Sequence, residues 1–490
     1  MGLSLAERYL SLAIALGSNM ALARLLTPEQ IGLYSVSLAV ISVAQALRDF
    51  GVSSYLIQEK VLDEKQIGTV LSISLLMGVA LFLAALLAAP WAARYYNEPR
   101  MATTLMLVSG NFLLMPLCTV SLALLRRAMR FKVLMHIALV AAALGAMTSI
   151  TLATLGLGES SLAIGSLATN AVTAIGAWLA LPEHRFIRPS LERWRQVLKF
   201  GGQSSLVGCV TSISMDANDL IVGKVLGFHP VALLSRAQGL MYLFNRDLMA
   251  AVRNVALPAF AQAHRSGADL ERAYLKSVAM VTLFGWPFHG LVSLYALEVM
   301  DLLFGQQWHA AVALVPIFCI SGAFAAVNAL TPNLLVAVGR MDLAMRVDLM
   351  MQPIRVLLIL IAAVVFRSVE ACALAFMISA VISMPVFWWF KNQVLPDDRP
   401  RLFELLTLNI LITVAVLLPA LVQSLWVGFG RSHPLALHAW LPVAALGLVL
   451  GVLGAVHLRH PLAEEAVFQR WLGPWLHRIP VARWRRPKVN

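Results

Sequence analysis

Hydrophobic residues gather in long runs along the chain, with short clusters of polar and charged residues between them. A helix needs about 20 apolar residues to cross the hydrocarbon core of a bilayer, and it pairs all of its backbone polar groups internally. The pattern therefore predicts an all-α, polytopic membrane protein. The fourteen predicted spans lie near residues 3–25, 31–57, 67–93, 101–124, 133–155, 159–181, 200–222, 230–258, 277–297, 310–336, 343–366, 369–390, 404–427 and 436–457.

Composition favours a membrane protein over a soluble one. Of the 490 residues, 60% are hydrophobic and 13% are charged, whereas soluble domains carry about 25% charged residues. The net charge of +13 is better explained by the positive-inside rule than by a nucleic-acid partner, and no nucleic acid is expected. The first apolar run begins almost at Met1 and has no clear cleavage site. We therefore expect it to be a retained span and not a signal peptide.

The distribution of basic residues gives the chain an orientation. With both termini in the cytoplasm, the cytoplasmic segments hold 27 of the 38 Lys and Arg residues, and the opposite side holds six. Cytoplasmic loops of membrane proteins are enriched in Lys and Arg in this way. The basic tail also contains three tryptophans, which is typical of an interfacial anchor on anionic membrane lipids.

Two segments of the chain resemble one another at an offset of 200 residues. ARLLTPEQIGLYSV at 23–36 aligns with GKVLGFHPVALLSR at 223–236, matching Arg24 to Lys224 and Leu26 to Leu226. Each segment joins the first two spans of a six-span set, so we predict two parallel six-helix lobes with a cavity between them. The predicted order is an N-lobe (1–181), a basic amphipathic linker (182–199), a C-lobe (200–392), two appended spans (393–457) and a basic cytoplasmic tail (458–490).

Charged residues within the predicted spans are the main candidates for function, because a charge at the bilayer centre costs at least ~2.5–3.5 kcal/mol. Arginine suits a diphosphate, since its planar group donates two hydrogen bonds and stays charged. The alternative is structural: some arginines pair with neighbours or, like Arg253, reach the inner surface. The predicted substrate-binding residues are Arg48, Arg236, Arg246, Arg253 and Arg355, and the predicted ion-coupling residues are Asp49, Asp216, Asp219 and Asp348.

Helical spacing sharpens two of these predictions. Arg246 and Arg253 are seven residues apart, which places them on one face of a regular helix. Asp216 and Asp219 share a face and are candidates for a Na⁺ or H⁺ coupling site, or for ion pairs with Lys224 or Arg236.

No metal site and no other cofactor is expected. The chain has no P-loop, no dinucleotide fingerprint, no HExxH and no GxSxG, and its four cysteines lie in apolar runs without CxxC spacing. The isolated histidines His136, His229 and His289 are predicted to be satisfied polar residues and not ligands.

The segments ALARLLTPEQIGLYSVSLAV and LRDFGVSSYLIQ, followed by DANDLIVGKVLG at 216–227, LLSRAQGL at 233–240 and PAFAQ at 258–262, carry a family resemblance over most of residues 1–390. They are similar to Wzx-type O-antigen and exopolysaccharide flippases of the multidrug/oligosaccharidyl-lipid/polysaccharide superfamily. The resemblance implies a two-lobed fold of twelve to fourteen helices. It also implies functional roles for Arg48, Asp49, Asp216, Asp219 and Arg236, which fall within these motifs.

The activity that the resemblance implies is transport and not enzyme catalysis. Such flippases move an undecaprenyl-diphosphate-linked oligosaccharide from the cytoplasmic to the outer leaflet of the bacterial inner membrane. The implied partners are the lipid-linked oligosaccharide and the polysaccharide polymerase and export machinery.

Three alternatives stay open from the sequence. A multidrug or cation antiporter of the same fold would want an acid-lined cavity. A membrane polysaccharide polymerase or ligase would need a large outward loop, and the longest predicted outward loops cover only 297–309 and 428–435. A scaffold without transport activity would not need arginines within its spans.

Overall fold

The computed structural model of the chain describes residues 2–49, 56, 63–181, 190–192, 194–195, 216–395, 398–458 and 460–464. Within these residues the chain is helical and contains no β-strand, as predicted. The helices of the first half are α1 (Gly2–Leu25), α2 (Pro28–Asp49), α4 (Glu64–Tyr96), α5 (Arg100–Ser109), α6 (Asn111–Arg127), α7 (Phe131–Thr154) and α8 (Glu159–Leu179). Residues 216–225 form a further helix.

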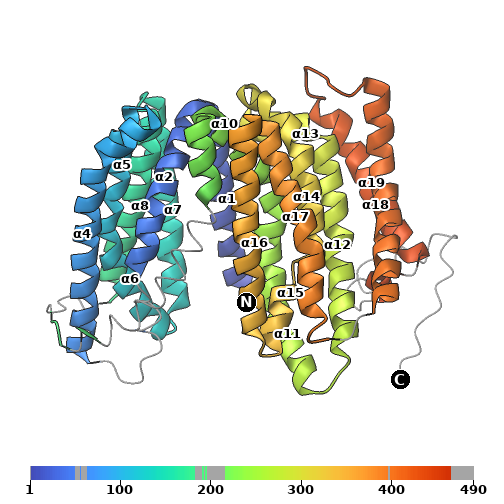
Figure 1. The fold of residues 1–490 in the computed structure, drawn as a ribbon, viewed down its shortest axis with the longest axis horizontal. Coiled ribbons are helices and arrows are strands. Elements are labelled where there is room, and N and C mark those ends of the chain that lie inside the picture. The colour runs from blue at the N-terminus through green and yellow to red at the C-terminus, as the bar shows by residue number, and fades with distance from the viewer. Residues whose placement is uncertain are drawn as a thin grey trace. The chain divides into compact units, whose positions relative to one another are not determined.

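The second half continues with regular and irregular helices (Figure 1). In chain order they are α10 (Phe228–Tyr242), the π-helix η2 (Leu243–Leu248), α11 (Met249–Arg265), α12 (Leu270–Leu294), α13 (Ala296–Phe304), the 3₁₀-helix η3 (Gln306–Leu314), α14 (Val315–Asn328), α15 (Thr331–Ala337), α16 (Met341–Ile361), the π-helix η4 (Ala362–Phe366), α17 (Val369–Lys391), α18 (Arg399–Val427), α19 (Leu437–His457) and the 3₁₀-helix η5 (Pro461–Glu464).

Ten helical runs among the described residues are long and apolar enough to cross a membrane. Several predicted spans are composite: 310–336 is built from η3, α14 and α15, and 230–258 from α10, η2 and α11. Pro316 and Pro332 lie in the first turn of α14 and α15, where a missing N–H costs nothing. The total of fourteen spans stays a prediction.

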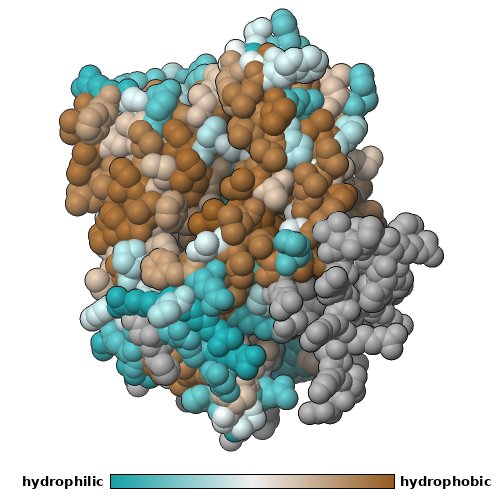
Figure 2. Space-filling model, turned by 90° about the vertical axis from the view of Figure 1, so that its right-hand side faces the viewer, coloured by the Kyte–Doolittle hydropathy of each residue, from teal (hydrophilic) through white to brown (hydrophobic). Residues whose placement is uncertain are grey.

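Large apolar side chains on these helices point away from the protein. Leu87 is 75% exposed, Trp91 73% and Trp426 89%. On the face that Figure 2 shows, hydrophobic side chains form a broad band with hydrophilic residues above and below it. Such a band is expected where lipid, and not water, surrounds the helices.

The chain divides into two compact units. Unit 1 comprises Met1–Leu233, Leu303–Gln307 and Ala363–Val369, and unit 2 comprises Leu234–Leu302, Trp308–Ala362 and Glu370–Asn490. The predicted linker 182–199 lies largely outside the described residues. The predicted lobe boundaries therefore stay predictions.

Both copies of the predicted repeat form one helix, a short turn and the start of a second helix. In the first copy α1 ends at Leu25 and α2 begins at Pro28, and in the second the helix 216–225 is followed by α10. In both copies, a hydrogen bond from or to the end of the first helix joins it to another segment of unit 1. Lys224 donates to the carbonyl of Tyr95, and Gln307 donates to the carbonyls of Ala23 and Leu26.

Within unit 1, an ion-pair cluster joins α2 to the junction of α4 and α5. The guanidinium of Arg100 lies 2.9 Å from Glu98 Oε1 and 2.8 Å from Glu29 Oε1. Its hydrogen bonds hold the pKa of the Glu98 carboxyl below its usual range. Between α7 and α8 the contact is made by small residues, since a Cβ at Gly145 would come within 1.8 Å of Thr169 Oγ1.

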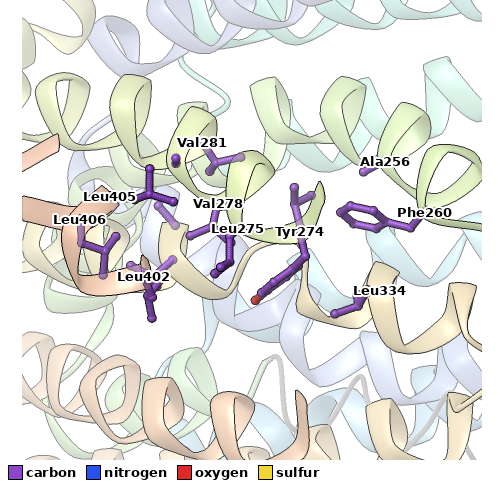
Figure 3. Close-up of a cluster of buried hydrophobic side chains, with 14 of the residues drawn as sticks. Ala256, Phe260, Tyr274, Leu275, Val278, Val281, Leu334, Leu402, Leu405 and Leu406 are labelled. Carbon is purple, nitrogen blue, oxygen red and sulfur yellow. The ribbon is translucent and has the colours of Figure 1, made fainter. Parts of the chain in front are cut away.

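Unit 2 is built around α12, which contacts α11, α14 and α18. Its buried residues join a hydrophobic cluster in which Tyr274 and Leu275 of α12 lie near Phe260 of α11 and Leu402 of α18 (Figure 3). The Tyr274 hydroxyl shares a 2.8 Å hydrogen bond with Thr331 Oγ1 at the start of α15.

Buried polar contacts fix the last two helices to unit 2. Asn409 of α18 donates to the carbonyl of Ala279 (2.9 Å) and to Thr282 Oγ1 (2.7 Å) on α12. Between α18 and α19, Arg431 lies 2.9 Å from Glu298, whose side chain is only 1% exposed. Polar contacts thus join α18 to α12 and the segment after α18 to α13, and the prediction of 393–457 as two appended spans stays a prediction.

The crossing of α18 and α19 depends on a glycine. A Cβ at Gly447 would come within 2.1 Å of the carbonyl oxygen of Val416, whereas at Gly454 its nearest neighbour would be 3.9 Å away. We expect Gly447→Ala to lower the free energy of unfolding by about 1–3 kcal/mol, because the two backbones must separate. The matched control Gly454→Ala should leave the free energy of unfolding unchanged or raise it slightly. The midpoint of thermal unfolding in detergent measures both, and equal midpoints would contradict the prediction.

Candidate functional site

Three of the five predicted arginines lie on one irregular span, α10–η2–α11. Arg236 belongs to α10, Arg246 to the π-helix η2 and Arg253 to α11. A π-helical turn takes up extra residues and redirects the side chains that follow it, and such turns are frequent at functional sites. The simple seven-residue spacing that predicted a shared face for Arg246 and Arg253 therefore does not apply across η2.

Arg246 projects from η2 toward polar neighbours. Its Nε donates to Asp247 Oδ1 at 2.9 Å, and its side chain is 69% exposed. The guanidinium carbon also lies 5.4 Å from the centroid of the Tyr242 ring, within the range of a cation–π contact. The Tyr242 hydroxyl in turn accepts a 3.0 Å hydrogen bond from Gln238 Nε2. Gln238, Tyr242 and Arg246 follow one another at four-residue intervals.

Arg355 of α16 lies within electrostatic range of the same tyrosine. It interacts electrostatically with Tyr242 and with Asp348, which lies seven residues earlier on α16. Its guanidinium donates to Gln352 Oε1 at 2.5 Å and lies 5.8 Å from the centroid of the Phe376 ring. Two of the predicted arginines therefore interact with Tyr242, Arg246 through a ring contact and Arg355 electrostatically.

The other two arginines of unit 2 are held by different partners. The Arg236 guanidinium lies 5.1 Å from the centroid of the buried Trp308 ring. Arg253 donates to the backbone carbonyl of Asn245 at 2.7 Å, eight residues earlier in the chain. That bond satisfies a carbonyl of the π-helix, which favours a structural role for Arg253.

Positive charge exceeds negative charge among these groups. Arg236, Arg246, Arg253 and Arg355 carry four positive charges, and Asp247 and Asp348 carry two negative charges. A surplus of two positive charges within a membrane calls for an anionic ligand or water. We call the group of Arg246, Arg355 and Tyr242 the arginine–tyrosine site.

The candidates of the first half are less completely described. Arg48 and Asp49 are the last residues of α2, and their side chains lie outside the described part of the structure. Asp216 and Asp219 lie on the helix 216–225, where Asp219 Oδ1 accepts a 3.2 Å hydrogen bond from Asn218. Within unit 1, neither carboxylate forms an ion pair with Lys224 in the part of the chain that the structure describes, and the alternative pair with Arg236 stays a prediction.

Sequence reasoning missed Tyr242 and Gln238. The spacing of these residues could have identified them. Residues four apart on a helix are neighbours, and Gln238, Tyr242 and Arg246 form such a series. Within the described residues no group of three or more His, Cys, Asp or Glu side chains is arranged to hold a metal ion.

Comparison with known sequences gives one family and several relatives. A family described as polysaccharide biosynthesis protein matches residues 21–313. The chain is 22% identical over 330 residues to the lipopolysaccharide biosynthesis protein WzxC of Escherichia coli, a match that covers 66% of each chain. It is 26% identical over 337 residues to the amylovoran biosynthesis protein AmsL of Erwinia amylovora, covering 68% of this chain and 86% of that protein.

Solved structures show that the fold is shared with transporters. A structure of the lipid II flippase MurJ in an inward closed conformation matches with a TM-score of 0.74 and 12% identity, covering 96% of this chain and 98% of the flippase. An inward-facing multidrug resistance MATE family transporter of the MOP superfamily matches with a TM-score of 0.59 and 17% identity, covering 81% and 96%. The all-helical, polytopic fold predicted from the sequence is the fold of these proteins.

Proposed function

The chain belongs to the polysaccharide biosynthesis protein family, and from this we propose that it is a flippase for a lipid-linked oligosaccharide, with no enzymatic step. The substrate would be an undecaprenyl-diphosphate-linked repeat unit, moved from the cytoplasmic to the outer leaflet of the bacterial inner membrane by alternating access. The names of the relatives and the flippase fold support this proposal.

The observation that carries the proposal is the arginine–tyrosine site within the membrane spans of unit 2. A diphosphate that links a lipid to a sugar carries two negative charges, and the surplus of positive charge among the arginines and aspartates described above is also two. Arginine donates bidentately to phosphate oxygens, so Arg246 and Arg355 would each take one phosphate. Tyr242 would interact with both guanidinium groups and hold them in position.

The direction of transport follows from the proposed orientation. The distribution of basic residues favours a cytoplasmic position for both termini. With the inside of the cell negative, moving one negative charge outward gains ~2.3 kcal/mol per 100 mV. The membrane potential would therefore favour export of the diphosphate. A proton or Na⁺ gradient is the second proposed source of energy.

A multidrug antiporter has the same fold, and the charges distinguish the two functions. A cavity for organic cations would have a surplus of acidic groups, whereas the four predicted substrate-binding arginines of unit 2 are accompanied by two aspartates, Asp247 and Asp348. Positive charge in a medium of low dielectric constant repels a cation strongly. We therefore propose the anionic substrate.

The test is transport by the purified protein in lipid vesicles. The probe is a fluorescent short-chain polyprenyl-diphosphate oligosaccharide, and transfer between leaflets is measured by its accessibility to a quencher. We expect rapid transfer of this probe, faster when the destination side is positive, and no transfer of a neutral glycolipid with the same sugar. Transport of a lipophilic cation in place of the diphosphate probe would overturn the proposal in favour of the antiporter.

A further inference from the structure

A buried histidine lies against the π-helix that carries Arg246. His289 of α12 is 2% exposed, and its Nε2 lies 3.4 Å from Asn245 Nδ2 on η2. The rings of Phe244 and Phe288 flank it, with centroids 5.6 and 5.3 Å away. Helix α14 packs against the imidazole at Gly322, where an added Cβ would come within 2.5 Å of His289 Cε1. Three elements of unit 2 thus enclose one imidazole.

The hydrogen bonds of this group are incomplete. His289 Nδ1 and Asn245 Oδ1 are both buried and have no hydrogen-bond partner among the described residues. The Asn245 amide donates to the carbonyl of Gly322 at 3.2 Å and toward His289 Nε2. Because Nε2 then acts as the acceptor, the neutral ring carries its proton on Nδ1. Buried polar groups are normally satisfied, and exceptions inside a membrane mark candidate functional sites.

We propose that His289 is a proton-binding site linked to the arginine–tyrosine site, so that the protonated protein binds the anionic substrate more tightly. The inference rests on the proposed function, because the ligand whose binding it changes is the lipid-linked diphosphate. It assigns a role to a histidine that the sequence alone predicted to be a satisfied polar residue.

Protonation changes the hydrogen bonding of η2. In the imidazolium both ring nitrogens carry a hydrogen, so Nε2–H faces the Asn245 amide donor and the contact becomes repulsive. Rotating the amide presents Asn245 Oδ1, which is unpartnered in this structure, to Nε2–H. The rotation also removes the hydrogen bond to the Gly322 carbonyl. Asn245 directly precedes Arg246, so protonation of His289 both adds positive charge and changes the side-chain contacts of the residue next to Arg246.

The charged groups on the surrounding elements determine whether protonation of His289 strengthens or weakens binding of the diphosphate. The η2 helix carries Arg246 and Asp247, which pair with one another, and α11 carries Arg253, bonded to the Asn245 carbonyl. The helix α14 carries only the thiol of Cys319 as a titratable group. No carboxylate touches the imidazole among the described residues. A diphosphate bound at Arg246 would supply the missing negative charge, so substrate binding and proton uptake reinforce one another.

The first measurement is the affinity of the purified protein for the short-chain polyprenyl-diphosphate oligosaccharide between pH 8 and pH 5. We expect the wild-type Kd to fall with pH by up to about tenfold per unit, the limit for one linked proton. His289→Gln should remove this dependence. The control is His136→Gln, an exposed histidine that should leave it unchanged. A wild-type slope that persists in His289→Gln would overturn the proposal.

The second measurement does not need the substrate. In protein labelled with ¹⁵N-histidine, the signal lost in His289→Gln reports its protonation, and we expect a neutral Nδ1–H form at pH 8 that becomes imidazolium on acidification. Gly322→Ala, which would displace the ring, should change that titration. If the signal never titrates, the proton site is refuted. If it titrates but the wild-type protein binds no diphosphate probe at any pH, the proposed function and the link to substrate fail while the proton site stands.

Discussion

Replacing Arg246 and Arg355 together by alanine is expected to slow flipping of the diphosphate probe by at least about a hundredfold. A hydrogen bond to a charged group contributes about 1.5–3 kcal/mol, so each single substitution should cost about ten- to a hundredfold. In the single variant Arg355→Ala, Asp348 on the same helix would also lose the positive charge that interacts with it. Its carboxylate would then repel the phosphate. Initial rates in vesicles measure the effect.

Two further variants separate charge from geometry. Arg246→Lys keeps the charge but loses the planar fork, so an intermediate rate is expected. The control Arg340→Ala removes an arginine just before α16 whose ion pair with Asp342 is exposed on the surface, and it should flip the probe at the wild-type rate. Equal rates in the Arg246/Arg355 double variant and in Arg340→Ala would remove the arginine–tyrosine site from the mechanism.

Replacing Lys391 by methionine is expected to lower the free energy of unfolding by about 3–5 kcal/mol, the usual cost of leaving one member of a buried ion pair alone. Lys391 Nζ lies 2.9 Å from Glu271 Oε1, and the two side chains are 0% and 10% exposed. Nζ also lies 4.2 Å from the centroid of the Trp388 ring. The lysine therefore ties the end of α17 to the start of α12.

The chain offers a matched control for this substitution. Lys65 and Glu192 form a pair of the same length, 2.9 Å, with side chains that are 68% and 60% exposed. Lys65→Met should cost no more than about 1 kcal/mol, because water screens an exposed pair. Adding Glu271→Gln to Lys391→Met should recover part of the loss. Thermal unfolding in detergent measures all three, and similar midpoints for Lys65→Met and Lys391→Met would show that burial does not decide the outcome.

Hydropathy was sufficient to predict the helices, because the bilayer allows only segments that satisfy their own backbone. It could not predict η2. The residues LFNRDL contain neither glycine nor proline, and the π-turn is accompanied by a contact from Arg253 to the Asn245 carbonyl eight residues away. That contact is a property of the folded helix, with no local sequence signal.

The candidate site was only partly predictable for a similar reason. Intramembrane charge singled out Arg246 and Arg355, but 109 residues separate them in the chain, and their shared interaction with Tyr242 depends on tertiary packing. Lys391, which directly follows the predicted span 369–390, was not among the predicted site residues. Its partner Glu271 lies 120 residues earlier, and a pattern read along the chain cannot reveal so distant a pairing.

The contact of Asn409 with α12 has a consequence for biosynthesis. The carbonyl of Ala279 receives this hydrogen bond from a residue 130 positions further along the chain. At a translation rate of ~5–20 residues per second, α12 leaves the ribosome roughly 6–26 s before Asn409 does. During that interval the face of α12 that will contact α18 has no partner from this chain. The insertion machinery or surrounding lipid must cover it, so we expect nascent chains stalled before residue 409 to be more susceptible to quality-control proteolysis than the complete chain.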